Sequence, residues 1–227
     1  MTTLIFIRHC EAYGNLMRVF QGHTDAPISD RGARQLEALS RRFAGVSFDA
    51  IYSSPLQRAR QTAEAANKTH RLPLQIEPGL IEINGGAWEG KKWADLPVLY
   101  PEAYEDWSIA PYRFQAPEGE SMRQVYNRVW KAALSIVERN PGKQVVCVSH
   151  GCALRNLLCR AMGKPIEELN TVDWCDNTAV SILRFHKNGT VSVVLQNDNS
   201  HLANGLSTFA EQTWHLPENR NKIIVDE

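Results

Sequence analysis

The residues best suited to chemistry are Arg8 with His9, Arg58, and His150, each of which lies just beyond a short apolar run. Guanidinium groups match the equatorial oxygens of a phosphoryl group two at a time. A neutral imidazole with one unprotonated nitrogen is a competent nucleophile near neutral pH. Together these residue types predict phosphoryl transfer, in which a planar anionic group moves between oxygen and a nucleophile.

Phosphoryl transfer from an ester also needs an acid that protonates the leaving oxygen. Glu82 is the candidate, because it lies in the glycine-rich stretch 80–86, LIEINGG. A single glutamate is more often a surface residue. Its assignment as the acid therefore depends on its lying close to the histidines and arginines.

The elements that must position these groups are three short strands, predicted over residues 4–7, 48–52 and 144–148. Ligands of open α/β sheets bind outside the carboxyl ends of the strands, so the groups that follow these strands should meet. We expect Ser54 to cap a helix that continues to about residue 67 and places Arg58 in its first turn. An arginine at the positive end of a helix dipole is unfavourable unless an anion pairs with it.

The other elements alternate between strand and helix, which predicts an α/β fold with a mainly parallel sheet. Further helices are expected over 29–43, 121–139 and 153–162, a strand over 74–76, and a hairpin of antiparallel edge strands over 178–185 and 191–196. We expect one domain, 1–227, with an insertion or cap region of short helices at about 77–117 and a polar C-terminal tail from about residue 197.

Composition narrows the class of protein. The chain has 227 residues, 43% of them hydrophobic, with 25 Lys and Arg against 25 Asp and Glu. This balance of charges argues against a nucleic-acid partner. The sequence contains no apolar run of about 20 residues, so we expect no membrane span. The N-terminus is interpreted as a first strand and not a signal peptide. Five cysteines without a C-x-x-C pair predict reduced thiols in a cytoplasmic protein.

Six segments, in order along most of the chain, resemble those of the histidine phosphatase superfamily in its phosphoglycerate mutase-like branch. They are RHCE at 8–11 with Asn15, QG at 21–22 followed by 25–32, YSSPLQRARQTA at 52–63, Glu82 with GAWEG at 86–90, EGES at 118–121, and VSHG at 148–151. An R-H-x-E segment alone is weak evidence, whereas six segments in order are specific.

The resemblance implies a three-layer α/β/α sandwich and a phosphohistidine intermediate. It makes His9 the nucleophile, and Glu82 the proton donor and later the base that activates water. No metal and no cofactor are expected, and the expected partner is a small phosphorylated substrate. The residues implied in binding the phosphoryl group or substrate are Arg8, Asn15, Gln21, Gly22, Arg58, His150 and Gly151.

Two positions depart from the family pattern. Cys10 stands where the family usually has glycine, and Ala12 stands where it has serine or threonine. The first adds bulk beside the phosphate loop, and the second removes a hydroxyl. Neither removes a charged catalytic group, so we expect activity. Cys10 and Cys152 would make the site sensitive to oxidation only if exposed and ionised, whereas a packed thiol is inert.

The mutases of this family resemble the pattern R-H-G-E-S-x-W-N at the start of the chain and carry E-R-x-Y-G after the acid. Here Gly14 replaces the tryptophan, and Ile83 and Asn84 follow Glu82, so the groups expected on a substrate carboxylate are missing. We therefore favour a phosphomonoester hydrolase of the histidine acid type. A cofactor-dependent phosphoglycerate mutase and a non-catalytic phosphate-binding or regulatory protein are the alternatives.

Other classes receive less support. A cysteine phosphatase, H-C-x5-R, would need arginine at position 16, where the chain has Leu16. No P-loop and no G-x-S-x-G segment occurs. In the cap region we expect Trp88, Trp93 and Tyr100 either to contact an apolar or ring-bearing leaving group or only to pack the insertion. Whether the protein forms a homodimer is left open.

Overall fold

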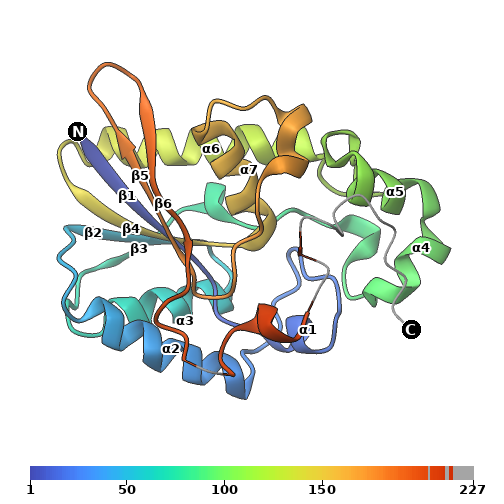
Figure 1. The fold of residues 1–227 in the computed structure, drawn as a ribbon, viewed down its shortest axis with the longest axis horizontal. Coiled ribbons are helices and arrows are strands. Elements are labelled where there is room, and N and C mark those ends of the chain that lie inside the picture. The colour runs from blue at the N-terminus through green and yellow to red at the C-terminus, as the bar shows by residue number, and fades with distance from the viewer. Residues whose placement is uncertain (204, 213–214, 217–227) are drawn as a thin grey trace.

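A six-stranded mixed sheet forms the centre of the molecule (Figure 1). The computed structural model describes residues 1–203, 205–212 and 215–216. The strand order is β3-β2-β4-β1-β5-β6. The strands are β1 Thr2–Arg8, β2 Ala50–Ser53, β3 Leu74–Ile76, β4 Gln144–Ser149, β5 Val180–Phe185 and β6 Val191–Asp198.

The predicted strands lie side by side and end together. β1 and β2 both pair with β4 in parallel, with Arg8 opposite Ser149 and Ser53 opposite Val148. The residues that follow β1, β2 and β4 therefore emerge together at the carboxyl ends of these strands. The hairpin is antiparallel as predicted. Of its two strands only β6 is an edge strand, because β5 lies inside the sheet against β1.

Helices cover both faces of the sheet, giving the predicted α/β/α sandwich (Figure 1). One face carries α2 (Asp30–Phe43) and α3 (Gln57–Ala66), and the other carries α6 (Met122–Arg139) and α7 (Gly151–Ala161). Ser121 caps α6 and Ser29 caps α2, each accepting a backbone N–H bond. These caps satisfy orphan donors at the helix starts.

Two predicted helix starts were wrong by about two residues. α3 begins at Gln57 with Leu56 as its N-cap. The Ser54 hydroxyl accepts the Leu56 N–H at 3.4 Å and also hydrogen bonds with Nε2 of His150. α7 begins at Gly151 directly after β4, earlier than the predicted residue 153. Arg58 still lies in the first turn of α3.

The segment 77–117 contains only short helices among its described elements. They are η1 Pro78–Leu80, η2 Gly86–Trp88, η3 Trp93–Asp95, α4 Leu96–Leu99, α5 Pro101–Ile109 and η4 Pro111–Arg113. Its aromatic side chains do not pack only with one another. Trp107 contacts Phe20, which precedes the segment, and Trp174, which follows it. The segment thus shares the main core with α6 and α7.

The remaining short elements are α1 Tyr13–Leu16, η5 Ile166–Thr171 and η6 Thr208–Glu211. β6 extends through Asp198, so the predicted tail starts later than residue 197. Its described part returns to the sheet edge, where Gln35 donates to the Leu206 carbonyl. Residues 204, 213–214 and 217–227 of the predicted tail lie outside the described residues. No helix in the described ranges is long and apolar enough to cross a membrane.

Candidate active site

The four groups predicted to bind or attack a phosphoryl group lie together. Arg8 ends β1, His9 follows it, Arg58 is in the first turn of α3, and His150 is the N-cap of α7. The imidazole centroids of His9 and His150 are 5.0 Å apart. All four side chains are buried. The parallel strand pairing brings them to one place from parts of the chain that are far apart in sequence.

His9 has its ring orientation and tautomer set by the backbone. Its Nδ1 donates to the Cys10 carbonyl at 2.6 Å, which leaves Nε2 as the unprotonated nitrogen of the neutral ring. Burial, followed by the positive charges of Arg58 and Arg8, lowers the pKa of His9 well below its usual value. The Asn177 amide donates to the His9 carbonyl at 2.8 Å. His9 is therefore a neutral, immobilised imidazole.

Two backbone carbonyls hold the guanidinium group of Arg58. Its Nη1 donates to the Thr24 carbonyl and its Nη2 to the Gly22 carbonyl, both at 2.8 Å. Its Nε is buried without a hydrogen-bond partner. Burial lowers the pKa of Arg58, and the carboxylates of Glu82 and Asp25 oppose that shift. The guanidinium is thus fixed on one side and has an unused donor on the other.

Glu89 orders the loop that provides those carbonyls. Its carboxylate accepts backbone N–H bonds from Gly22, His23 and Thr24 at 3.2, 2.8 and 2.9 Å. Burial alone would raise the pKa of Glu89, but the bonds from the Thr24 hydroxyl and these N–H groups lower it. Glu89 therefore helps to position Arg58 through the loop that it orders.

Arg8 and His150 also carry unused donors or acceptors. Arg8 Nη1 donates to the Cys175 carbonyl at 2.6 Å, whereas its Nε is buried without a partner. His150 Nε2 hydrogen bonds with the Ser54 hydroxyl at 2.7 Å, and its Nδ1 is buried without a partner. Burial, then Arg58 and His9, lower the pKa of His150 well below its usual value.

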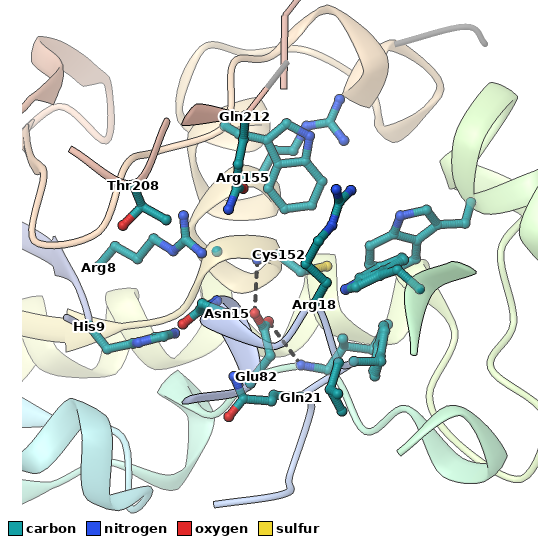
Figure 2. Close-up of a pocket in the computed structure, with 18 of the residues that line it drawn as sticks. Arg8, His9, Asn15, Arg18, Gln21, Glu82, Cys152, Arg155, Thr208 and Gln212 are labelled. Atoms are coloured by element: carbon teal, nitrogen blue, oxygen red, sulfur yellow. Dashed lines mark hydrogen bonds between the residues drawn. The ribbon is translucent and has the colours of Figure 1, made fainter. Parts of the chain in front are cut away.

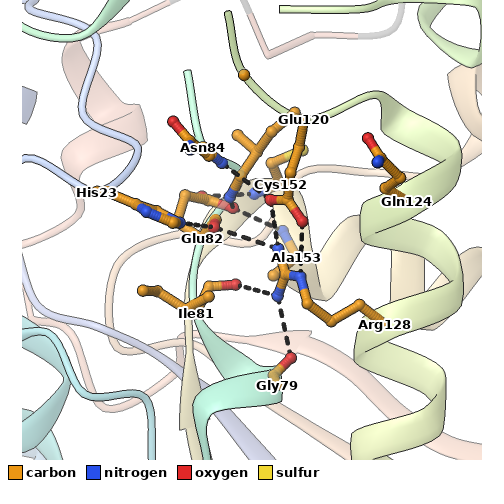
Figure 3. A network of polar contacts seen from close by, with 12 residues as sticks. His23, Gly79, Ile81, Glu82, Asn84, Glu120, Gln124, Arg128, Cys152 and Ala153 are labelled. Atoms are coloured by element: carbon orange, nitrogen blue, oxygen red, sulfur yellow. Dashed lines mark hydrogen bonds and ion pairs between the residues drawn. The ribbon is translucent and has the colours of Figure 1, made fainter. Parts of the chain in front are cut away.

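Glu82 lies beside the N-terminus of α7. Its carboxylate accepts N–H bonds from Cys152 at 3.0 Å and Ala153 at 2.9 Å, and from its neighbour Ile83 at 3.0 Å (Figure 3). Backbone donors at a helix N-terminus favour an anion. With His9 and Arg8 it lines a cavity of about 200 Å³ (Figure 2). Glu82 therefore lines the same cavity as Arg8 and His9.

An ion pair that the sequence did not reveal holds the Glu82 loop (Figure 3). Arg128, on α6, donates to the carbonyls of Gly79, Ile81 and Glu82 at 3.1, 2.8 and 3.3 Å. It also pairs with Glu120, which accepts the Asn84 N–H at 3.0 Å. Burial would raise the pKa of Glu120, but the bonds from Arg128 and Asn84 lower it. The EGES segment therefore supports the acid loop.

The other predicted contacts differ in position. Asn15, Gln21 and Gly151 line the cavity, and the Gln21 Oε1 atom is buried without a partner. Asn15 Oδ1 accepts the Ala12 N–H at 3.1 Å, which fixes its side chain. Gly22, Arg58 and His150 are not among the lining residues. His150 packs on the ring of His9, and the Gly22 carbonyl accepts a bond from Arg58.

The two residues that depart from the family pattern lie in the protein interior. Cys10 and Ala12 are both fully buried. Cys10 donates its N–H to the Thr62 hydroxyl at 3.0 Å, and burial raises the pKa of its thiol to about 11. Burial, followed by the Glu82 charge, raises the pKa of Cys152 well above its usual value. Both sulfurs are therefore thiols rather than reactive thiolates.

Only one of the three aromatic residues predicted from the cap region lines the cavity. Trp93 lines the cavity, but Trp88 is fully buried behind it, and neither Trp88 nor Tyr100 is a lining residue. Trp107 and Trp174 line the cavity instead. No pattern in the sequence indicated Trp174, because it lies between η5 and β5, far from the cap region along the chain.

Three other supporting residues were missed by sequence reasoning. Asn177 holds the His9 carbonyl, Ser54 holds the His150 ring, and Thr62 accepts the Cys10 N–H. Ser54 and Thr62 fall inside the 52–63 segment that resembles the family pattern, which is the signal that could have found them. Asn177 and Arg128 lie outside every such segment.

The histidine phosphatase superfamily (branch 1) model matches residues 4–199, so the chain belongs to this superfamily. Phosphoserine phosphatase 1 of Hydrogenobacter thermophilus is 32% identical over 195 residues, covering 86% of this chain and 92% of that protein. Adenosylcobalamin/alpha-ribazole phosphatase of Escherichia coli is 32% identical over 166 residues, 73% of this chain and 82% of that protein.

The fold has solved counterparts as well. The structure of Bacillus stearothermophilus YhfR, 32% identical, superposes with a TM-score of 0.85 over 88% of this chain and 99% of that one. Together, these similarities confirm the predicted superfamily, its phosphatase-type branch and the predicted three-layer fold.

Proposed function

We propose that this protein is a phosphomonoester hydrolase that acts on a small phosphorylated metabolite through a phosphohistidine intermediate. The observation that carries the proposal is a set of three buried nitrogen atoms without partners, Arg8 Nε, Arg58 Nε and His150 Nδ1, around the His9 ring. Leaving buried polar groups unpaired is costly, and such groups gathered at one place indicate a ligand. An anion with several oxygens would satisfy them together.

In the first half of the proposed reaction, Nε2 of His9 attacks phosphorus. The N–P bond forms as the bond from phosphorus to the ester oxygen breaks, and Glu82 gives its proton to that oxygen. Arg8, Arg58 and His150 stabilise the charge on the equatorial oxygens.

In the second half, a water molecule attacks the phosphohistidine. Glu82, now ionised and held by three backbone donors, takes a proton from that water. The N–P bond breaks, inorganic phosphate leaves, and His9 returns to its neutral form. Glu82 thereby ends each cycle with the proton that the next leaving group needs.

A hydrolase is favoured over a mutase by the environment of Gly14. A Cβ atom at position 14 would lie 1.9 Å from Cδ of Gln21, so the Gln21 side chain occupies the space of any larger residue there. The relatives named phosphoserine phosphatase and alpha-ribazole phosphatase support the same choice.

The test is rapid quenching during turnover of a phosphate ester labelled at phosphorus. We expect label on His9 that is labile in acid and stable in base, as a phosphoimidazole requires. His186→Gln, which changes a histidine of the distant hairpin, is the control and should keep the label. Turnover without any labelled histidine would reject the intermediate, and isomerisation of a phosphoglycerate without phosphate release would favour the mutase.

A further inference from the structure

The far side of the cavity is a wall of aromatic rings. Trp93, Trp107 and Trp174 line it and are each partly exposed, and Phe20, which is buried, lines it with them. The ring centroids are 5.2 Å apart for Phe20 and Trp93, 5.6 Å for Trp93 and Trp107, and 6.2 Å for Trp107 and Trp174. Rings at these separations contact one another, so the wall is continuous.

The wall belongs to the same cavity as the proposed reacting groups. His9 and Glu82 line one part of it, and the three tryptophans line another. An ester with its phosphorus at His9 has its leaving oxygen at Glu82. The tryptophans then provide a surface along which the rest of the leaving group can extend.

The charges in the cavity restrict what the leaving group carries. Among the described lining residues, Arg8, Arg18 and Arg155 are cationic, and Glu82 is the one carboxylate (Figure 2). The Arg155 guanidinium lies 4.6 Å from the centroid of the Trp174 ring, and its Nε donates to the Val172 carbonyl. Positive charge beside the wall disfavours an ammonium group, and Glu82 is already bound by three N–H donors.

We infer that the site selects phosphate monoesters whose leaving group is a flat aromatic ring, neutral or anionic, and discriminates against small ammonium-bearing esters of the phosphoserine type. This inference rests on the proposed function and names the substrate class of that site. The rings provide stacking contact that a saturated group of similar size lacks.

Two inhibitors isolate the ring from the chemistry. Benzylphosphonate and cyclohexylmethylphosphonate carry a methylene in place of the ester oxygen, so neither is hydrolysed and leaving-group acidity plays no part. We expect benzylphosphonate to bind about fivefold more tightly to the unaltered protein. O-phosphoserine should have a kcat/KM at least about tenfold below that of 2-phenylethyl phosphate.

The variants Trp107→Leu and Trp174→Leu should each bring the inhibitor ratio close to one. Trp130→Leu is the matched control, because Trp130 is a partly buried tryptophan that packs on Phe185 and does not line the cavity. It should keep the ratio. The affinity for inorganic phosphate should stay unchanged in all three variants, which shows that the phosphoryl end is intact.

A ratio near one in the unaltered protein, or a ratio unchanged in both cavity variants, would overturn the inference. Preference for O-phosphoserine would do so as well. If 2-phenylethyl phosphate is not hydrolysed and no phosphohistidine forms, the proposed function fails, while the inhibitor ratio still reports on the wall. The two failures are therefore distinguishable.

Discussion

The two ends of the cavity are built in different ways. At the phosphoryl end, Arg8 and His9 line the cavity, and Arg58 and His150 lie next to His9. All four emerge from strand ends and helix starts, are buried, and hydrogen bond to backbone or to the Ser54 hydroxyl. At the aromatic end, the lining comes from short helices and loops, and its tryptophans are partly exposed.

This difference separates reaction from selection. A group that reacts must be held to a fraction of an ångström, and sheet edges and helix starts provide that rigidity. A surface that selects a leaving group is built by segments that vary without disturbing the sheet. Substitutions of Arg8, His9, Arg58 or His150 should therefore lower the rate for every ester, and substitutions at the aromatic end should change the preference among esters. Glu82 lies between these groups, because its proton goes to the leaving oxygen.

The largest expected effect comes from His9→Ala. Without the nucleophile, hydrolysis of an aryl phosphate should fall by about 10³-fold or more. The measurement is steady-state kcat/KM, with His186→Gln as the control. Residual activity within about tenfold of the unaltered protein would remove His9 from the role of nucleophile.

The next effect tests the fork at Arg58. Arg58→Lys keeps the charge but cannot donate to the Gly22 and Thr24 carbonyls and to the phosphoryl group at once, so kcat/KM should fall about 10²-fold for aryl and alkyl esters alike. Arg60→Lys, an exposed change on the same helix, should be silent. If Arg58→Lys altered only the preference among esters, the separation of the two ends would be wrong.

Glu82→Gln should have a smaller effect that depends on the ester. Alkyl esters need protonation of a poor leaving group, so their phosphorylation step should slow about 10²-fold, whereas that of an aryl ester should change little. Single-turnover formation of the phosphohistidine measures this step without the later water attack. Equal losses for both kinds of ester would count against Glu82 as the acid.

The smallest effect is a pH dependence. The pKa values of His9 and His150 are lowered by burial and by the nearby arginines, so neither ring should gain a proton as the pH falls from 8 to 6. Proton NMR of the two rings measures this directly. In the unfolded chain both rings bind protons below about pH 6.5. Stability to urea should therefore be full above that pH and decrease as the pH falls below it.

If the His9 ring titrated near pH 6.5 in the folded protein, His9 would no longer be a pre-formed neutral nucleophile. That ring would then add nothing to the pH dependence of the free energy of unfolding, because it would bind protons equally in the folded and unfolded states. The NMR and urea measurements thus test one property of the phosphoryl end by independent means.

Much of the phosphoryl end could be predicted from the sequence, because its residues follow strands whose apolar runs are short and clear. Arg8 with His9, Arg58 and His150 were placed at one sheet edge on that ground, and the structure places them there. Helix starts were less accurate. Ser54 resembles an N-cap locally, but α3 starts further along the chain, and the Ser54 hydroxyl also makes a tertiary bond with His150 that no local pattern indicates.

The sequence by itself determined the fold class, the family and the residues that should meet, since alternating apolar runs and motif order are local properties of the chain. Only the tertiary structure decided that Arg128 supports the Glu82 loop, that Asn177 holds His9, and that Trp174 joins the aromatic wall. These contacts join residues far apart in sequence. Their geometry depends on how α6, α7 and the loops pack against the sheet, which no local pattern encodes.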